Sequence, residues 1–159
     1  DTFNIPIVSL VDEPGFLIGP DAEKAGTILH GTEAVLATTE STVPWTTVMI
    51  RKSFGVAAAA HYGPDGYVLA WPSAESGPLP LEGGVAVAFK KEIAEAIDPD
   101  AKRKELEEKM AKNQNPFPRA EAFSVHEIID PRETRKYISL WAERIQSQLR
   151  ANLTKKITS

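Results

Sequence analysis

Val48-Met-Ile-Arg-Lys-Ser-Phe-Gly-Val-Ala-Ala-Ala-Ala-His61 is the stretch that decides the fold of this chain. It continues an apolar, β-prone run that begins at Trp45, and a run of this kind predicts a buried strand as far as Ile50. The chain then passes two basic residues, turns at Gly55 and enters an alanine-rich segment with high helix propensity. The order of strand, glycine turn and helix therefore predicts a βα unit.

The start of this helix is a candidate site. The first backbone N–H groups of a helix lack partners within it, so the amides of Val56 and Ala57 are predicted to point outward. With the positive end of the helix dipole, they can hold an oxygen that is acquiring negative charge. An ordinary strand-to-helix turn packed in the core is the alternative interpretation, and the stretch by itself leaves both open.

Length and composition restrict the class of protein. The chain has 159 residues, of which 42% are hydrophobic and 25% charged, as expected for one globular domain with its own core. A formal net charge of −4 disfavours nucleic acid as a partner, because binding to phosphates needs a basic face. The absence of cysteine excludes disulfides, thiolate metal sites and cysteine nucleophiles.

The cellular context is predicted from what precedes the first strand and from the lengths of the apolar runs. No apolar run approaches the length of a membrane-spanning helix, and the start at Asp1 lacks the basic residues of a signal peptide. We therefore expect no membrane partner and a cytoplasmic location, with an organelle matrix as the alternative. An apolar strand begins almost at once, so we also expect the chain to be a piece of a longer protein.

The apolar pattern predicts a mainly parallel sheet covered by helices, which is an α/β fold. Strands are expected at 5–11, 45–50 and 67–71, and helices at about 20–39, 56–60, 81–97, 99–113 and 131–148. Residues 73–80 are expected to form a loop. Three short strands leave open sheet edges, so further strands are expected from a missing segment or from another chain.

Three features of the helices are predicted in more detail. Asp98 is expected to cap a highly charged helix that forms a solvated arm. Asp130 is expected to cap the last helix, with Glu133 three positions further on. One face of that helix is expected to dock on the sheet or on another subunit, and it consists of Tyr137, Leu140, Trp141, Arg144, Ile145 and Gln148. Residues 1–150 are predicted to be one domain and residues 151–159 a polar tail.

Side chains for catalysis are scarce. The three histidines, His30, His61 and His126, have no metal-ligand spacing, and there is no Gly-x-Ser-x-Gly motif. The pair Asp12-Glu13 follows the first strand, where a turn cap and a catalytic dyad are both possible interpretations. This shortage favours chemistry in which the protein supplies backbone donors and orientation, while a cofactor or substrate supplies the reactive group.

Several motifs in a fixed order resemble a known family. Phe3-Asn-Ile-Pro-Ile-Val-Ser-Leu-Val-Asp-Glu-Pro-Gly-Phe-Leu-Ile-Gly19, with Gly26 and His30-Gly31, is similar to the beta-type carboxyltransferase subunit of biotin-dependent acyl-CoA carboxylases. The later motifs that match are Arg51-Lys-Ser-Phe-Gly-Val-Ala57, Ala70-Trp-Pro-Ser-Ala-Glu75, Glu82-Gly-Gly-Val85 and Asp130-Pro-Arg-Glu-Thr-Arg135. The resemblance runs from Phe3 to about Gln148 and corresponds to the C-terminal half of such a subunit.

The resemblance implies a crotonase-like (ClpP/crotonase) fold with a C-terminal helical extension. It implies an enzyme of the ligase or transferase class in fatty acid and acyl-CoA metabolism, which moves a carboxyl group from carboxybiotin to the α-carbon of an acyl-CoA. The implied cofactor is biotin on a separate carrier domain, with no metal in this domain. The implied partners are the biotin carboxyl carrier and biotin carboxylase components, the N-terminal carboxyltransferase half, and further copies in a dimer or a trimer of dimers.

The resemblance also assigns residues. The backbone amides of Val56 and Ala57 would form an oxyanion hole for the biotin ureido oxygen, and the biotin side would consist of Gly15, Phe16, Ile18, Gly19 and Gly55. Most of the family reads Gly-Gly-Ala where this chain reads Gly55-Val56-Ala57. Valine would be strained there if the loop required a positive φ. The family often has aspartate or isoleucine at the position of Ala59, where it sets the choice of acyl group.

Other functions remain open alternatives at this stage. One is a biotin-dependent acyl-CoA decarboxylase that uses the same half-reaction, and another is an inactive dimerisation or scaffold domain. A crotonase-type hydratase or isomerase is a further alternative, although such enzymes usually need a carboxylate base in the other half. As an isolated fragment, the chain is expected to be incomplete and inactive.

Overall fold

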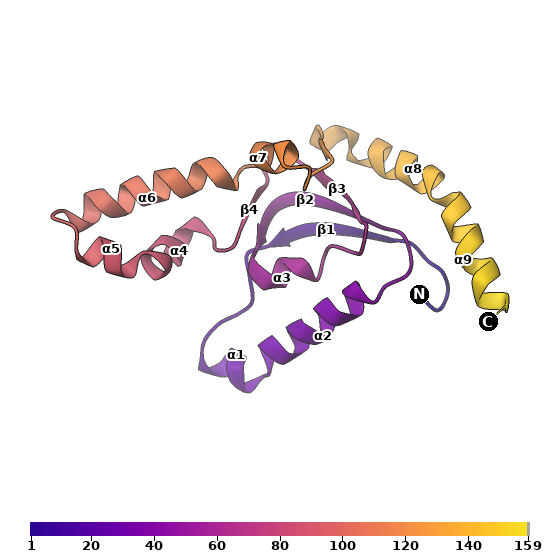
Figure 1. Cartoon of the computed structure of the whole chain (residues 1–159), viewed down its shortest axis with the longest axis horizontal. Coiled ribbons are helices and arrows are strands. Elements are labelled where there is room, and N and C mark those ends of the chain that lie inside the picture. Colours follow the sequence, from indigo (N-terminus) through magenta and orange to yellow (C-terminus); the bar gives the residue numbers. More distant parts are fainter. Residues whose placement is uncertain (159) are drawn as a thin grey trace.

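A computed structural model describes residues 1–158 as a five-stranded parallel sheet covered by helices (Figure 1). The strands are β1 (Ile7–Glu13), β2 (Trp45–Phe54), β3 (Tyr67–Ala70), β4 (Glu75–Gly77) and β5 (Glu127–Ile128). Four of these strands lie side by side in the order β1-β2-β3-β5, while β4 pairs with β2. Every pair is parallel. The predicted α/β fold with a parallel sheet is therefore confirmed.

Strand β2 is the centre of the sheet. Strand β1 runs along one edge of β2, while β3 and β4 follow each other along the opposite edge. Strand β3 pairs with Thr46–Met49 of β2, and β4 pairs with Lys52–Phe54. The prediction that 73–80 form a loop was wrong at β4, and β5 was also missed. Two of the additional strands expected for this sheet thus come from the chain itself.

The helix predicted at 131–148 is divided at Ile145 into α8 (Thr134–Arg144) and α9 (Gln146–Thr158), and two further helices predicted as continuous are broken as well. The first consists of α1 (Pro20–Lys24) and α2 (Thr27–Thr39), separated at Gly26, whose φ is +74°. The second consists of α4 (Leu81–Ala88) and α5 (Lys90–Ala94), separated at Phe89 with φ −118° and ψ 23°. Apolar periodicity continues across both breaks, so it does not reveal them.

The charged helix α6 (Pro99–Gln114) packs against α4 and α5, and the three helices extend to one side of the sheet as an arm (Figure 1). Asp98 accepts hydrogen bonds from the amides of Asp100 and Ala101, so the predicted N-cap is confirmed. Only Leu106 and Gln114 of α6 are buried, which confirms that the helix is largely solvated. The short helix α7 (Pro116–Glu121) returns the chain to the sheet.

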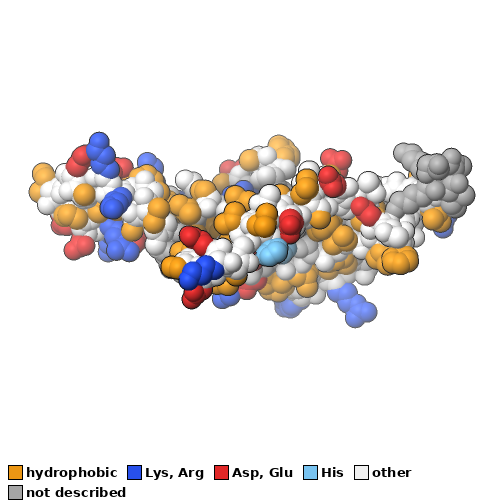
Figure 2. Space-filling model, turned by 90° about the horizontal axis from the view of Figure 1, so that it is seen from below, with side chains coloured by type: hydrophobic (Ala, Val, Ile, Leu, Met, Phe, Trp, Pro, Cys, Tyr) orange, Lys and Arg blue, Asp and Glu red, His pale blue; other side chains and the backbone are white. Residues whose placement is uncertain are grey.

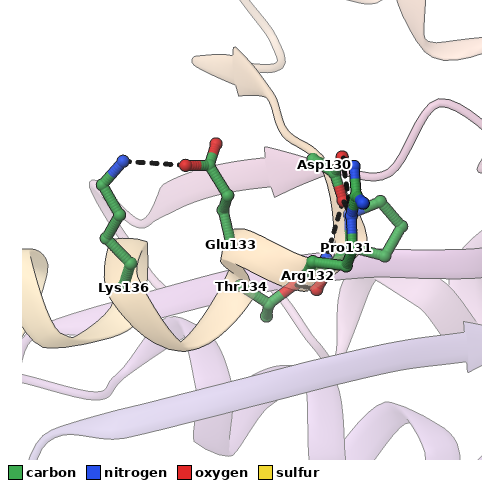
Figure 3. Close-up of polar contacts among 6 residues, drawn as sticks. All are labelled: Asp130, Pro131, Arg132, Glu133, Thr134 and Lys136. Carbon is green, nitrogen blue, oxygen red and sulfur yellow. Dashed lines mark hydrogen bonds and ion pairs between the residues drawn. The ribbon is translucent and has the colours of Figure 1, made fainter.

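The C-terminal segment packs on the opposite side of the molecule from the arm. It consists of a 3₁₀ turn (η1, Pro131–Glu133), α8 (Thr134–Arg144) and α9 (Gln146–Thr158). Asp130 accepts a hydrogen bond from the Arg132 amide and therefore caps the 3₁₀ turn, not the α-helix that was predicted, while the Glu133 side chain pairs with Lys136 instead of returning to the cap (Figure 3). Helix α9 continues through residues 151–158, where a polar tail was predicted.

The core lies on both faces of the sheet. Met49, Val68 and Ala70 face α7, while Val48, Leu69 and Ile129 face α8. Tyr137 and Ile138 of α8 pack against that second cluster, and Trp141 is buried, so the predicted docking of this helix on the sheet is confirmed.

Strand β1 lies at the border of the sheet within the described residues. Val8 is 41% exposed and Leu10 57% exposed, while Val11 is buried. Residues 1–158 place no second strand against β1 on the side away from β2. The sheet therefore has an open, partly apolar edge, as the sequence predicted.

Candidate functional site

The candidate residues gather at the carboxyl edge of the sheet because the strands are parallel. Glu13 is paired with Ser53, and Phe54 is paired with Gly77. The loop after β1 and the start of α3 (Gly55–Ala59) therefore lie beside each other at one edge (Figure 1). Active sites of α/β proteins collect at this edge.

In the turn into α3, the residue with a positive φ is a glycine and not Val56. Gly55 has φ +64°, which is costly for residues with a Cβ, whereas Val56 is not among the described residues with positive φ. The strain that valine would suffer is therefore avoided. The Val56 side chain is 66% exposed, while Ala57 is 4% exposed and packs inward.

The backbone amides of Val56 and Ala57 lie in the first turn of α3, where no carbonyl of the same helix can accept from them. Neither amide donates a hydrogen bond to another group in the part of the chain that the structure describes. Because α3 has only five residues, few peptide dipoles add up along its axis. Any stabilisation of an anion here comes mainly from the two N–H groups.

The loop from Gly15 to Gly19 is shaped by glycine at both ends. Gly15 has φ +127° and its amide donates to Glu13 Oε1 at 2.8 Å, while Gly19 has φ +110°. Between them Phe16 turns back against α2: a Cβ built on Gly31 would lie 2.2 Å from Phe16 Cζ. Ile18 instead faces outward and is 92% exposed. Four of the five predicted biotin-side residues thus lie on this loop, with Phe16 anchored and Ile18 exposed to a ligand or a neighbouring subunit, while Gly55 lies at the start of α3.

The adjacent acids have separate structural partners. Asp12 pairs with Arg51 at 2.9 Å, and this hydrogen-bonded guanidinium lowers the pKa of Asp12 below its ordinary value. Glu13 caps the amide of Gly15. The turn-cap interpretation therefore describes Glu13, and the two carboxyl groups do not form a dyad.

The histidines lie apart. His30 pairs with Glu33 on the surface, His61 Nδ1 lies 3.2 Å from Ser9 Oγ, and His126 Nδ1 accepts from the Val68 amide. Among the residues that the structure describes, no group of three or more His, Asp or Glu side chains is arranged to hold a metal ion. In the same residues no helix is long and apolar enough to cross a membrane.

Sequence reasoning missed a cavity of about 320 Å³ between α3, β4 and the end of α7. Its polar lining includes Ser53, Tyr62, Ser76 and Arg119. Burial raises the pKa of Tyr62, while its hydrogen bond with Ser53 and the charge of Arg119 act in the opposite direction. The residues come from segments that are far apart in sequence. The one local indication of this cavity in the sequence is the spacing of Gly55, Ala58 and Ala59, three small residues on one face of a helix.

One face of the molecule carries many exposed hydrophobic side chains (Figure 2). Those from α2 are Ile28, Leu29 and Leu36, which are 60%, 63% and 56% exposed. The spacing of Ala25, Ile28, Leu29, Val35 and Leu36 predicts a buried stripe along this helix, and in the described chain that stripe is partly exposed.

A parallel α/β domain of this kind, with free backbone amides at the carboxyl edge of its sheet, is of the crotonase-like class. Its structural neighbours are carboxyltransferases. The chain belongs to the carboxyl transferase domain family, whose profile matches residues 1–158. This confirms the family resemblance found in the sequence motifs.

Three comparisons show how the chain relates to known members. It is 40% identical to the propionyl-CoA carboxylase carboxyltransferase subunit of Haloferax mediterranei over 98% of this chain and 31% of the relative. It is 40% identical to the methylmalonyl-CoA decarboxylase subunit alpha of Propionigenium modestum over 87% of this chain and 27% of the relative. A transcarboxylase 12S crystal structure, with methylmalonyl-coenzyme A and methylmalonic acid bound, matches 91% of this chain and 28% of that one, with 42% identity and a TM-score of 0.81. The chain spans about a third of the length of these relatives.

Proposed function

We propose that this chain supplies the biotin-side half of a carboxyltransferase site, with acyl-CoA as the acceptor. The observation that carries the proposal is the pair of unpartnered amides at Val56 and Ala57, at the carboxyl edge of the sheet in a member of this family. Carboxylated biotin, when bound, would supply the carboxyl group.

The residues present fit the ureido group of biotin. Its carbonyl oxygen is an acceptor that gains negative charge when the ring gives up its carboxyl group, and two converging N–H donors favour that charged form. Gly55 leaves the approach open because it has no side chain, and glycine tolerates the positive φ with which α3 begins. Val56 and Ala57 would thus bind and orient the oxygen, and the exposed Ile18 would exclude water from one side.

The acceptor is proposed to be a short-chain acyl-CoA. The relatives that match are named for propionyl-CoA and methylmalonyl-CoA. Asp12 and Glu13, the two carboxylates that follow β1, are engaged by Arg51 and by the Gly15 amide, which disfavours either of them as the base of an isomerase or hydratase. The rest of the acyl-CoA site is proposed to come from another carboxyltransferase half.

Decarboxylation of an acyl-CoA is a second candidate, favoured by the relative from Propionigenium modestum. The same pair of amides would serve both directions, because each passes through the same charge on the ureido oxygen. Assays of the full-length protein in both directions, with the carboxylated carrier and with methylmalonyl-CoA, distinguish the two.

Further copies of the chain are proposed to cover the apolar face of α2. Exposed apolar side chains at this density mark an interaction surface more often than a free one. The related transcarboxylase 12S subunit assembles as a hexamer according to the description of its crystal structure. The 159-residue chain alone is accordingly proposed to be inactive.

The variant Ala57→Pro tests the oxyanion hole, because proline removes one proposed donor from a first-turn position. Transfer of labelled carboxyl groups from the carboxylated carrier to propionyl-CoA by the full-length protein is expected to slow by about 10²- to 10³-fold. Ala57→Gly and Val56→Ala retain both N–H groups and serve as matched controls. Unchanged turnover by a folded Ala57→Pro variant would refute the assignment.

A further inference from the structure

The cavity between α3, β4 and α7 contains a cation without a counter-ion. Arg119 lines it from α7, and none of the ion pairs in the part of the chain that the structure describes includes this residue. Its Nε atom is buried and has no hydrogen-bond partner among the described residues. A half-buried guanidinium without an acceptor is costly, which makes an anionic ligand the natural complement.

The position of Arg119 is fixed by its own backbone. Its carbonyl oxygen accepts hydrogen bonds from the amides of Ser124 and Val125, at 2.9 and 3.2 Å, and from Ser124 Oγ at 3.0 Å. These three bonds hold the end of α7 against the loop that leads to β5. The arginine is therefore placed by a built turn and does not hang from a loose surface segment.

Ser76 provides an independent second sign of a ligand. It lines the same cavity from β4, is only 4% exposed, and its Oγ has no hydrogen-bond partner within residues 1–158. Buried hydroxyl groups nearly always have a partner, so an empty one facing a cavity points to a missing group. Next to it, Tyr62 Oη and Ser53 Oγ are 2.7 Å apart and can offer one further donor.

The lining determines which ligand fits. Among the described residues, Arg119 is the only cation that lines the cavity, so a monoanion balances it better than a phosphate dianion. The planar guanidinium matches a carboxylate in two parallel hydrogen bonds. The remaining walls include Met49, Ala58 and Val125, which favour a short alkyl group, and 320 Å³ is at the small end for ligand sites.

We propose that this cavity binds a short aliphatic carboxylate, which accepts hydrogen bonds from the guanidinium of Arg119 and the hydroxyl of Ser76. The inference goes beyond the proposed function, since it requires neither biotin nor coenzyme A. The two sites share Gly55, but the amides of Val56 and Ala57 do not line this cavity, so failure of this inference would leave the oxyanion hole untouched.

Calorimetric titration of the full-length protein with sodium butyrate tests the proposal, with butyramide as a probe of the same shape and no charge. Saturable binding of butyrate is expected, with butyramide about tenfold weaker or more, because hydrogen bonds to a charged acceptor are stronger than those to a neutral one. Arg119→Gln is expected to weaken butyrate binding by about 10- to 100-fold.

Two further variants keep the test decisive if Arg119→Gln does not fold. Ser76→Ala removes an unpartnered hydroxyl, so it is expected to fold and to weaken butyrate binding about fivefold. Arg132→Gln changes an exposed arginine outside the cavity, and its affinity for butyrate is expected to equal that of the wild type. Equal affinity for butyrate and butyramide, unchanged binding by Ser76→Ala and Arg119→Gln, or no saturable binding by the wild type would each overturn the proposal.

Discussion

Replacing Gly31 with alanine tests how the loop after β1 is held in place. A glycine-to-alanine change inside a helix normally stabilises a protein by about 1 kcal/mol. Here the new Cβ would lie 2.2, 2.6 and 2.9 Å from three ring atoms of Phe16, so the ring must leave its position. Fully burying a phenylalanine contributes about 1.5–3 kcal/mol, and Phe16 is half-buried, so moving it forfeits about 1 kcal/mol. The two effects nearly cancel, and Gly31→Ala alone is expected to leave stability almost unchanged.

A double-mutant cycle separates the two effects. In a Phe16→Ala background the ring is absent, and Gly31→Ala is expected to stabilise by about 1 kcal/mol, which gives a coupling energy of about 1 kcal/mol. Urea denaturation curves of the four variants give the free energies, provided their m values agree. Thr32→Ala is the matched control, because Thr32 is exposed on the same helix and should have the same effect in both backgrounds. Equal stabilisation by Gly31→Ala in both backgrounds would refute the contact.

Three other substitutions have defined outcomes. Arg51→Gln is expected to raise the pKa of Asp12 toward 3.8 in a carbon-13 NMR titration. In the wild type, the stability that the Asp12–Arg51 pair gives is present above pH 3.8 and is lost as the pH falls through the lowered pKa. Burial and the hydrogen bond to Glu127 raise the pKa of Tyr67 to about 12, so Glu127→Gln is expected to lower it in an ultraviolet titration while burial keeps it above 10. The stability from this contact is present below pH 10 and is lost as the pH rises through about 12. Asp98→Ala is expected to cost about 1 kcal/mol in denaturant unfolding, since it removes the cap of α6.

Each of these substitutions has a control. Arg132→Gln removes a different ion pair and should not change the titration of Asp12. Tyr67→Phe should abolish the ultraviolet transition near pH 12 and identify its source. Asp98→Ser retains a capping oxygen and should recover most of the lost stability. Unchanged stability in Asp98→Ala would contradict the cap of α6. An unchanged pKa of Asp12 in Arg51→Gln would contradict the ion pair between these two residues.

The sequence predicted the elements that bury apolar side chains. Near-continuous apolar runs predicted β1, β2 and β3, and aspartate followed by proline predicted the start of α6 and of the 3₁₀ turn that leads into α8, because these patterns record burial and capping directly. Strand β4 is three residues, Glu75–Gly77, with neither an apolar run nor a β-branched residue. It is a strand because β2 offers its backbone edge there, and that partner is distant in sequence.

The candidate site was predictable only where it is local. Gly55, Val56 and Ala57 are consecutive, and the rule that first-turn amides lack partners needs no tertiary knowledge. Arg119 and Ser76 line the same cavity, which forms only when α7 packs back against the sheet. No local pattern marks either residue, so the cavity required the structure.

The shared edge of β2 gives this fold a place to vary its site without disturbing its core. Strands β3 and β4 are in register with β2 independently, and Trp71–Ala74 connects them. Side chains alternate along a strand, so one residue inserted in this connection would turn Ser76 away from the cavity and bring its neighbour Glu75 inward. A carboxylate would then face Arg119, and the affinity of the cavity for anions would fall, while β3 and its packing would not change. A change in the length of the connection between β3 and β4 can thus alter the ligand preference of the cavity during evolution, without any substitution of the residues that line it.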